Sequence, residues 1–260
     1  MNTRIMLLVV LFLVFSKQEI YSQFGFSHEV GVIVGPLALY SDFGQRNDNE
    51  TNFGNTSIAI GIIHYMNFAY RADCNCYTRD KYFNDHFKVR SEIDYHKTKL
   101  DHLGRWVAPD QQGAGPDFLR SMKGETRIFE IGAQLEYFPL SIRDFTAGGA
   151  KLAPFISAGV HWISYDPNIT YDEQLGFDSN FYGGKYDPIT SMQNEAGNTW
   201  AFLASVGVRY KLTPMSDLML DSRVQYYFSN WVDGLNPEVS ENKANEWHYW
   251  LNFGYIYYLQ

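Results

Sequence analysis

The fold is decided by the stretch from Trp247 to Leu259, which reads Trp-His-Tyr-Trp-Leu-Asn-Phe-Gly-Tyr-Ile-Tyr-Tyr-Leu. Every second residue from Trp247 onward is aromatic or leucine, whereas the residues between them are a mixture of polar, small and apolar types. This period of two predicts a β-strand with one uniformly apolar face. Aromatic residues crowd both ends of that face, with Leu251 and Phe253 between them, as rings do at the two interfaces of a membrane. The stretch therefore predicts a strand that crosses a bilayer.

The length of this stretch suits an outer membrane. From Trp247 to Tyr257 the strand rises about 3.3 Å per residue, which gives a height of about 25 Å after a tilt of about 40° and matches the apolar band of a barrel. The ending also resembles the closing-strand signal of bacterial outer-membrane barrels, which Gly254, Tyr257 and Leu259 carry here. Phe253, where a polar residue is usual, and the final Gln260 depart from that signal.

The other end of the chain resembles an export signal. Arg4 precedes an apolar run from Ile5 to Phe15, and a polar segment containing Ser22 follows. The run is too short to span a bilayer as a helix. A basic start, a short apolar run and a small residue at a cleavage position predict a secretory signal peptide over residues 1–22, with the barrel over residues 23–260. A short N-terminal anchor is the alternative.

Composition narrows the class of protein further. The 260 residues carry a formal net charge of −8, which argues against a nucleic-acid partner. After residue 15 no apolar run is long enough for a transmembrane helix. Yet 17% of the residues are aromatic, and the mean hydropathy is −0.29. An exported chain of this kind fits a barrel whose apolar exterior is diluted by a polar lumen and polar loops.

Seven further segments alternate in the same way as the last one. They are residues 28–40, 57–68, 87–96, 129–137, 152–165, 200–212 and 218–228. The predicted fold class is therefore all-β, an eight-stranded antiparallel transmembrane β-barrel of the Gram-negative outer membrane. Connectors after odd-numbered strands are longer on average than those after even-numbered strands, which matches long outer loops and short periplasmic turns.

Titratable side chains share one face of several segments, most clearly between Phe87 and His96. In a small barrel this face lines the lumen, where opposite charges must pair to offset lost hydration. The predicted lumen charge network consists of Lys88, Arg90, Glu92, Asp94, Glu130, Glu136, Arg209, Lys211, Asp221 and Arg223. Its equal numbers of bases and acids predict a filled, paired interior rather than an ion-selective pore.

The connector from 71 to 85 is longer than a periplasmic turn should be, and it contains Cys74 and Cys76. Two cysteines this close cannot build a disulfide framework, and no further metal ligands follow at a known spacing. A structural or redox-linked pair and two free thiols stay open as alternatives. The connector is a candidate docking site for a periplasmic partner, and an ordered turn without a partner is the simpler alternative.

The sequence contains no motif of a hydrolase, zinc protease, phosphate loop or dinucleotide fold, so it predicts no catalytic residue, cofactor or metal. Small barrels can still be enzymes that act on lipid A or on peptides. The candidate residues would be His161 with Ser157, or His96 with Asp94 and Glu92. Along a strand His161 and Ser157 lie about 13 Å apart, too far for the hydrogen bond that a nucleophile and its base need.

The first predicted strand resembles a known family. Residues 28–42 are similar to the opening of PorG-like outer-membrane barrels of the type IX secretion apparatus in Bacteroidetes-type bacteria. The matching positions are Glu29, Gly31, Gly35 and Asp42, and the departures are Pro36, Tyr40 and Ser41. This resemblance implies a component of type IX protein secretion. Residues 72–77 resemble a turn of an uncharacterised flavobacterial barrel family, which implies no known activity.

Three functions follow as hypotheses. The first is a non-enzymatic outer-membrane barrel with a structural or docking role, whose partners are outer-membrane lipid and periplasmic secretion components. The second is an outer-membrane enzyme that acts on lipid A or peptides. The third is a narrow barrel for transport or ligand binding. The filled lumen favours the first hypothesis over the third.

Overall fold

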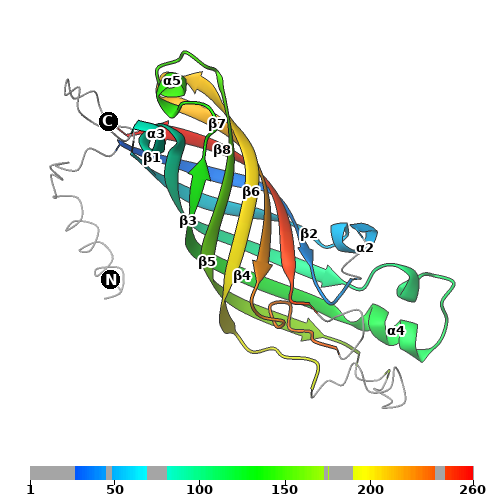
Figure 1. The fold of residues 1–260 in the computed structure, drawn as a ribbon. Helices are drawn as coiled ribbons and strands as arrows, with labels where there is room; N and C mark the ends of the chain where they lie inside the picture. Colours follow the sequence, from blue (N-terminus) through cyan, green and yellow to red (C-terminus); the bar gives the residue numbers. More distant parts are fainter. Residues whose placement is uncertain are drawn as a thin grey trace, which may run out of the picture.

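The computed structural model describes residues 27–44, 49–68, 81–172, 175, 190–237 and 244–259. Its strands form one closed antiparallel barrel in which each strand pairs with its neighbours in the sequence and β1 pairs with β8 (Figure 1). The strands are β1 Ser27–Tyr40, β2 Thr56–Asn67, β3 Phe87–Asp101, β4 Lys123–Tyr137, β5 Leu152–Thr170, β6 Gly197–Thr213, β7 Ser216–Tyr227 and β8 Trp247–Tyr258. The predicted eight-stranded barrel is confirmed.

Among the described residues, five short helices lie outside the wall of the barrel. They are α2 Asn49–Phe53, α3 Lys81–His86, the 3-10 helix η1 Arg105–Val107, α4 Ala114–Ser121 and α5 Ile142–Thr146. The α2 and α4 helices lie at one end of the barrel, and α3 and α5 lie at the other end, where β1 begins (Figure 1). Among the residues described, no helix is long and apolar enough to cross a membrane.

The two faces of each strand differ as the alternation predicts. On β2 the side chains of Ile58 and Ile62 are 63% and 64% exposed, whereas Ala59 and Ile63 are fully buried. On β8 the odd-numbered residues face outward and the even-numbered residues, such as Trp250 and Asn252, are buried inside. The exterior is thus an apolar surface, and polar side chains fill the interior.

Glycine closes the barrel where β1 meets β8. A Cβ atom added at Gly35 would lie 2.0 Å from the Leu251 carbonyl oxygen and 2.9 Å from the Asn252 Cα. At Gly31 the same atom would lie 2.5 Å from the Tyr255 carbonyl oxygen. Only glycine allows so close an approach of two strands, so these two residues bring the first and last strands together.

The connectors divide between the two ends as their lengths predict. Residues 41–55, 102–122, 171–196 and 228–246 connect strands at the end that holds α2 and α4. The connectors 68–86, 138–151 and 214–215, which are shorter on average although 68–86 is longer than 41–55, join strands at the end that holds α3 and α5 (Figure 1). Because short turns mark the periplasmic end of bacterial barrels, the α3 and α5 end is called the periplasmic end below.

Some strands are longer than the sequence predicts. The β4 strand begins at Lys123 rather than Phe129, and β5 continues to Thr170 rather than Tyr165. In these extensions the outward side chains are charged or polar, as at Arg127 and Asn168, so the apolar alternation no longer marks them. The predicted signal peptide at 1–22 and the cysteine pair at 74 and 76 lie outside the described residues.

Candidate functional site

The lumen is the site that the sequence singled out, and the structure brings its predicted residues together. Nine of the ten predicted network residues are buried inside the barrel, and the side chain of Lys211 is 8% exposed. They come from β3, β4, β6 and β7, whose inward positions alternate with the apolar exterior. Three layers of ion pairs follow one another from the periplasmic end toward the outer loops.

The periplasmic layer is built around two acids that the prediction missed, Glu29 and Asp217. Glu29 accepts from Lys88 at 2.5 Å and from Arg209 at 2.7 Å. Asp217 lies 3.6 Å from Arg209 and 3.3 Å from Lys211. Each base thus faces at least one acid in this layer, which compensates for its burial.

Below these pairs, aromatic rings fill the periplasmic end of the lumen. Phe138 and Phe155 pack with ring centroids 5.5 Å apart, and the buried Phe145 of α5 lies beside Lys211. The guanidinium of Arg209 lies over the Tyr65 ring at 4.0 Å from its centroid. The charges of the periplasmic layer are therefore separated from the periplasm by packed rings.

The middle layer joins Arg90 and Arg223 through shared acids. Arg90 lies 2.8 Å from Glu92, 3.1 Å from Asp221 and 3.4 Å from Glu136. Arg223 lies 3.0 Å from the same Glu92 oxygen. These five side chains all have 0% exposure, so they are fully buried inside the barrel. Arg223 also lies 3.3 Å from a sixth side chain, that of Asp94.

The outer layer is centred on His161, a third residue that the predicted network omitted. One ring nitrogen of His161 lies 2.7 Å from Glu92, and the other lies 3.0 Å from Glu130. A carboxylate beside each ring nitrogen favours the form of the ring that carries a proton on both nitrogens and a positive charge. The Gln225 amide also donates to Glu130 at 2.6 Å.

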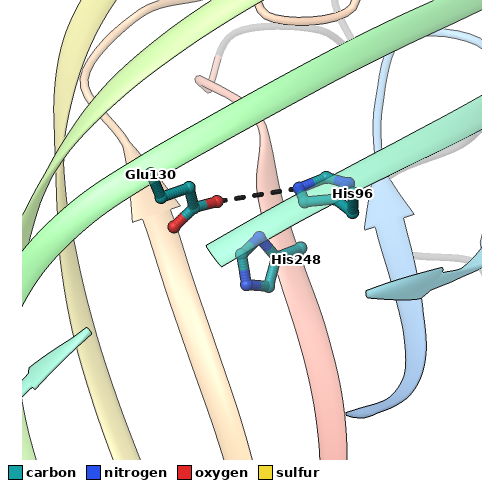
Figure 2. Close-up of side chains that lie close together, drawn as sticks. All are labelled: His96, Glu130 and His248. Carbon is teal, nitrogen blue, oxygen red and sulfur yellow. Dashed lines mark ion pairs between the residues drawn. The ribbon is translucent and has the colours of Figure 1, made fainter. Parts of the chain in front are cut away.

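Beside His161, two further histidines face Glu130 (Figure 2). Nε2 of His96 lies 3.6 Å from Oε1 of Glu130, and the rings of His96 and His248 have centroids 5.7 Å apart. The Tyr227 hydroxyl lies 2.7 Å from Nδ1 of His248 and donates to Oε1 of Glu130 at 3.2 Å. One ligand-type atom from each of His96, Glu130 and His248 lies within 4.8 Å of the other two.

The charge balance of the lumen differs from the predicted one. Glu29 and Asp217 add two carboxylates to the predicted five, whereas the count of Lys and Arg on the inward faces of the described strands stays at five. Glu29 stands alone as an acid among small and apolar residues of β1, so its segment showed no charged face. Asp217 lay in the segment that the sequence assigned to a turn.

The lumen places the candidate catalytic residues in other roles. Ser157 donates to Gln134 at 2.6 Å and lies 2.7 Å from the Ser205 hydroxyl, while both nitrogens of His161 face carboxylates. His96 contacts Glu130 and the Thr98 hydroxyl. Neither histidine is placed to remove a proton from Ser157, so the geometry at these residues is that of a buried polar network.

At the outer end, the loops close over the barrel through polar contacts with strand and loop backbone. The Asp42 amide donates to Asp233 at 2.7 Å, and the Thr126 hydroxyl donates to the Val232 carbonyl at 2.6 Å. His102 packs against the Phe43 ring with centroids 4.9 Å apart. Burial, together with the nearby positive charge of Lys123, lowers the pKa of His102 from 6.5 to about 4.

No protein-family model and no curated protein matches this chain. Solved outer-membrane proteins resemble it in structure at low sequence identity. Neisserial surface protein A is 15% identical, with 90% of this chain and 98% of that chain covered and a TM-score of 0.47. A major outer membrane protein from Thermus thermophilus is 15% identical, with 89% and 99% covered and a TM-score of 0.42. OprG from Pseudomonas aeruginosa is 13% identical, with 89% and 94% covered and a TM-score of 0.36.

The exterior of this barrel itself shows where the chain resides. Large apolar side chains on every strand stand outward, among them Ile62 at 64%, Val206 at 59% and Phe253 at 53% exposed. A continuous exposed surface of this kind is unfavourable in water and is the surface that a bilayer covers. A closed antiparallel barrel with such a surface is an outer-membrane protein.

Proposed function

We propose that this chain is a non-enzymatic, non-conducting outer-membrane barrel whose role is structural, exerted through the surfaces at its two ends. The observation that carries the proposal is the middle layer of the lumen. Arg90, Arg223 and their acids have no solvent exposure and span the interior from β3 and β4 to β7. An ion that crosses the barrel would have to separate these pairs and lose its own water.

The energetics of that layer oppose a narrow transport function. Breaking a buried pair leaves a charge without compensation, which costs about 3–5 kcal/mol. Arg90 alone contacts three carboxylates, so opening a path beside it disturbs several pairs together. An eight-stranded barrel has an interior that side chains fill, and here bulky side chains such as Trp250 and Tyr65 add to the charged ones.

Conductance across a planar bilayer tests this proposal. The refolded chain should give no steady single-channel current in conditions where a reconstituted porin does. A variant in which Arg90 and Glu136 are both replaced by Ala removes two large side chains from the middle layer. Its single-channel conductance should be higher than that of the parent. A steady open channel in the unaltered chain would contradict the closed lumen.

The finer role that we propose is docking of a periplasmic component of type IX secretion. It is supported by the resemblance of residues 28–42 to PorG-like barrels and by the long connector 68–86 at the periplasmic end. The matching positions serve the barrel itself, since Glu29 pairs with two bases and Gly35 allows β1 to approach β8. Support for the secretion role therefore comes from the resemblance and not from these contacts.

Co-purification from native outer membranes tests the docking role. Replacing residues 71–85 by a short Gly-Asn turn should abolish recovery of a periplasmic partner, whereas an equal change in the outer connector 102–122 should leave it intact. Equal recovery from both variants would refute docking through this connector. Lipid A that changes in mass when the chain is deleted would instead support the enzyme hypothesis.

A further inference from the structure

One cluster of side chains in the lumen is not explained by the pairing of opposite charges. It consists of His96, Glu130 and His248. Glu130 lies on β4, His96 on the adjacent β3, and His248 on β8 (Figure 2). All three side chains are buried, with exposures of 1%, 2% and 1% for His96, Glu130 and His248. We infer that these three residues form a binding site for one divalent transition-metal ion, with Zn²⁺ as the best fit.

The geometry is close to that of three ligands on one ion. Zinc lies about 2.0–2.2 Å from imidazole nitrogen and carboxylate oxygen, so tetrahedral ligand atoms lie about 3.4 Å from one another. Nε2 of His96 lies 3.6 Å from Oε1 of Glu130, and one ligand-type atom from each of the three residues lies within 4.8 Å of the other two. Small rotations of the side chains are enough to close this set around an ion.

The cluster also holds polar atoms without hydrogen bonds. Within the described part of the chain, Nε2 of His96 and Nε2 of His248 are buried and have no hydrogen-bond partner. A buried polar group without a partner is unfavourable by about 1–3 kcal/mol. Coordination of an ion by Nε2 of His96, the nitrogen that lies beside Glu130, would satisfy that atom and offset its cost.

The surroundings orient the rings as they do at known metal sites. Nδ1 of His96 lies 3.2 Å from the Thr98 hydroxyl, which leaves Nε2 to face Glu130. The Tyr227 hydroxyl joins His248 to Glu130, and the Gln225 amide holds the second oxygen of Glu130. Hydrogen bonds of this kind fix the tautomer and the direction of metal-ligating histidines and carboxylates.

The net charge of the lumen favours a cation. The strands described here send seven carboxylates and five Lys or Arg side chains into the lumen, a deficit of two positive charges with neutral histidines. The deficit is concentrated in the middle and outer layers, where Arg90 and Arg223 face five carboxylates. A charged His161 offsets part of it, and a divalent ion at the neighbouring cluster would offset the rest.

The donor set selects the class of ion. Two imidazole nitrogens and one carboxylate oxygen are suitable ligands for Zn²⁺. They also suit other divalent transition metals, whose affinity for such ligands generally rises from Mn²⁺ to Cu²⁺. Mg²⁺ prefers oxygen ligands and retains its water, so this set should not bind it. Because the ligands come from strands on different sides of the lumen, a bound ion would join opposite walls of the barrel.

Equilibrium dialysis of the refolded barrel in detergent, with Zn²⁺ as the probe, Mg²⁺ as the control and elemental analysis as the readout, tests the inference. The parent for this test carries His28→Gln, His64→Gln, Cys74→Ser and Cys76→Ser. The first pair is removed because Nδ1 of His28 lies 3.1 Å from Nε2 of His64 and could bind zinc at the rim. The thiols are removed because cysteine binds zinc strongly.

We expect this parent to bind one Zn²⁺ per barrel and to bind no Mg²⁺. His96→Gln and His248→Gln should each weaken zinc binding by more than the roughly 100-fold that loss of an outer hydrogen bond causes. His102→Gln, which removes a histidine at the outer mouth, should leave binding unchanged. Zinc binding that is absent from the parent, or that survives both ligand substitutions, would overturn the site.

Folding of each variant is checked by β-sheet circular dichroism and protease resistance. Where a ligand variant does not fold, X-ray absorption of the zinc-loaded parent decides the matter. Two imidazole ligands on the ion are expected, and fewer than two would overturn the site. The inference is independent of the proposed structural role, because conductance and partner recovery are measured without reference to zinc.

Discussion

Arg223 illustrates what a charged residue contributes inside this barrel. Its guanidinium contacts Glu92 at 3.0 Å and Asp94 at 3.3 Å, and it lies 4.9 Å from the centroid of the Trp250 ring. In water such pairs contribute little, but here neither partner retains any hydration. The arginine is therefore needed mainly because the acids around it are buried.

Replacing Arg223 by Met should destabilise the barrel by about 3–5 kcal/mol, because the buried Asp94 loses its arginine partner and Glu92 loses one of its two. The matched control is Arg127→Met on the outer rim, where the arginine is 53% exposed and pairs with Glu125 at 3.0 Å. That change should cost at most about 1 kcal/mol. Urea unfolding in lipid vesicles measures both, and equal costs would contradict the buried network.

At the scale of single residues, the sequence identified charges where they alternate with apolar neighbours. Lys88 to Asp94 on β3 could be assigned to the lumen because four titratable residues occur at every second position. His161 and His248 could not, since a histidine among small and apolar residues gives no sign of its partners. Those partners lie on other strands, and only closure of the barrel brings them together.

The connector that follows β3 shows how an element outside the membrane is held in place. Arg120 of α4 donates to the carbonyl oxygens of Val107, Ala108 and Gln111 at 2.6–3.1 Å. His102 anchors the start of the same connector, with Nε2 lying 3.3 Å from the Met122 sulfur. The connector is thus fixed at its beginning and across its middle.

Acid should loosen this connector through His102. Because its folded pKa is lowered to about 4 from an ordinary 6.5, the unfolded form takes up a proton first as the pH falls. Stability is therefore full above about pH 6.5 and declines toward pH 4, by at most about 3 kcal/mol. Hydrogen exchange across 102–122 should rise over this range, and His102→Gln should remove the rise. An unchanged pH dependence in that variant would refute the assignment.

At the scale of elements, all eight strands could be predicted, but their outer ends could not. On β3 the outward residues change from Ile93 and Tyr95 to Lys97 and Lys99, while Thr98 and Leu100 remain buried. The strand leaves the apolar layer there but keeps its pairing with β4. A strand is predicted from sequence by the difference in hydrophobicity between alternate residues. This difference disappears where both faces of the strand meet water or loops.

The molecule as a whole is a wall with lipid on one side and a paired polar network on the other. Its periplasmic end is filled by aromatic rings, its middle by ion pairs, and its outer end by loop contacts. Closure at β1 and β8 leaves no unpaired strand edge among the described strands. This arrangement satisfies the backbone without water, as a membrane requires.

Depth in the membrane predicts the effect of a charge on the exterior. Phe253 lies in the middle of the outward face of β8 and is 53% exposed, whereas Tyr257 lies near its end and is 46% exposed. Phe253→Arg should cost about 2–4 kcal/mol, and Tyr257→Arg about 0–1 kcal/mol. Urea titration in vesicles compares the two variants. A larger cost at Tyr257 would place the bilayer elsewhere on the barrel.

The alternation of lipid-facing and lumen-facing residues can be measured directly with nitroxide labels on β2. One label is placed at each position from Ser57 to Ile63, in a chain whose Cys74 and Cys76 are replaced by serine. The labelled chains are measured in lipid vesicles. Accessibility to oxygen dissolved in the lipid should be high at Ile58, Ile60 and Ile62 and low at the positions between them, because only the first set faces outward. Equal accessibility along the strand, or access of a water-soluble relaxation agent to Ile60, would contradict a membrane-spanning barrel with a closed interior.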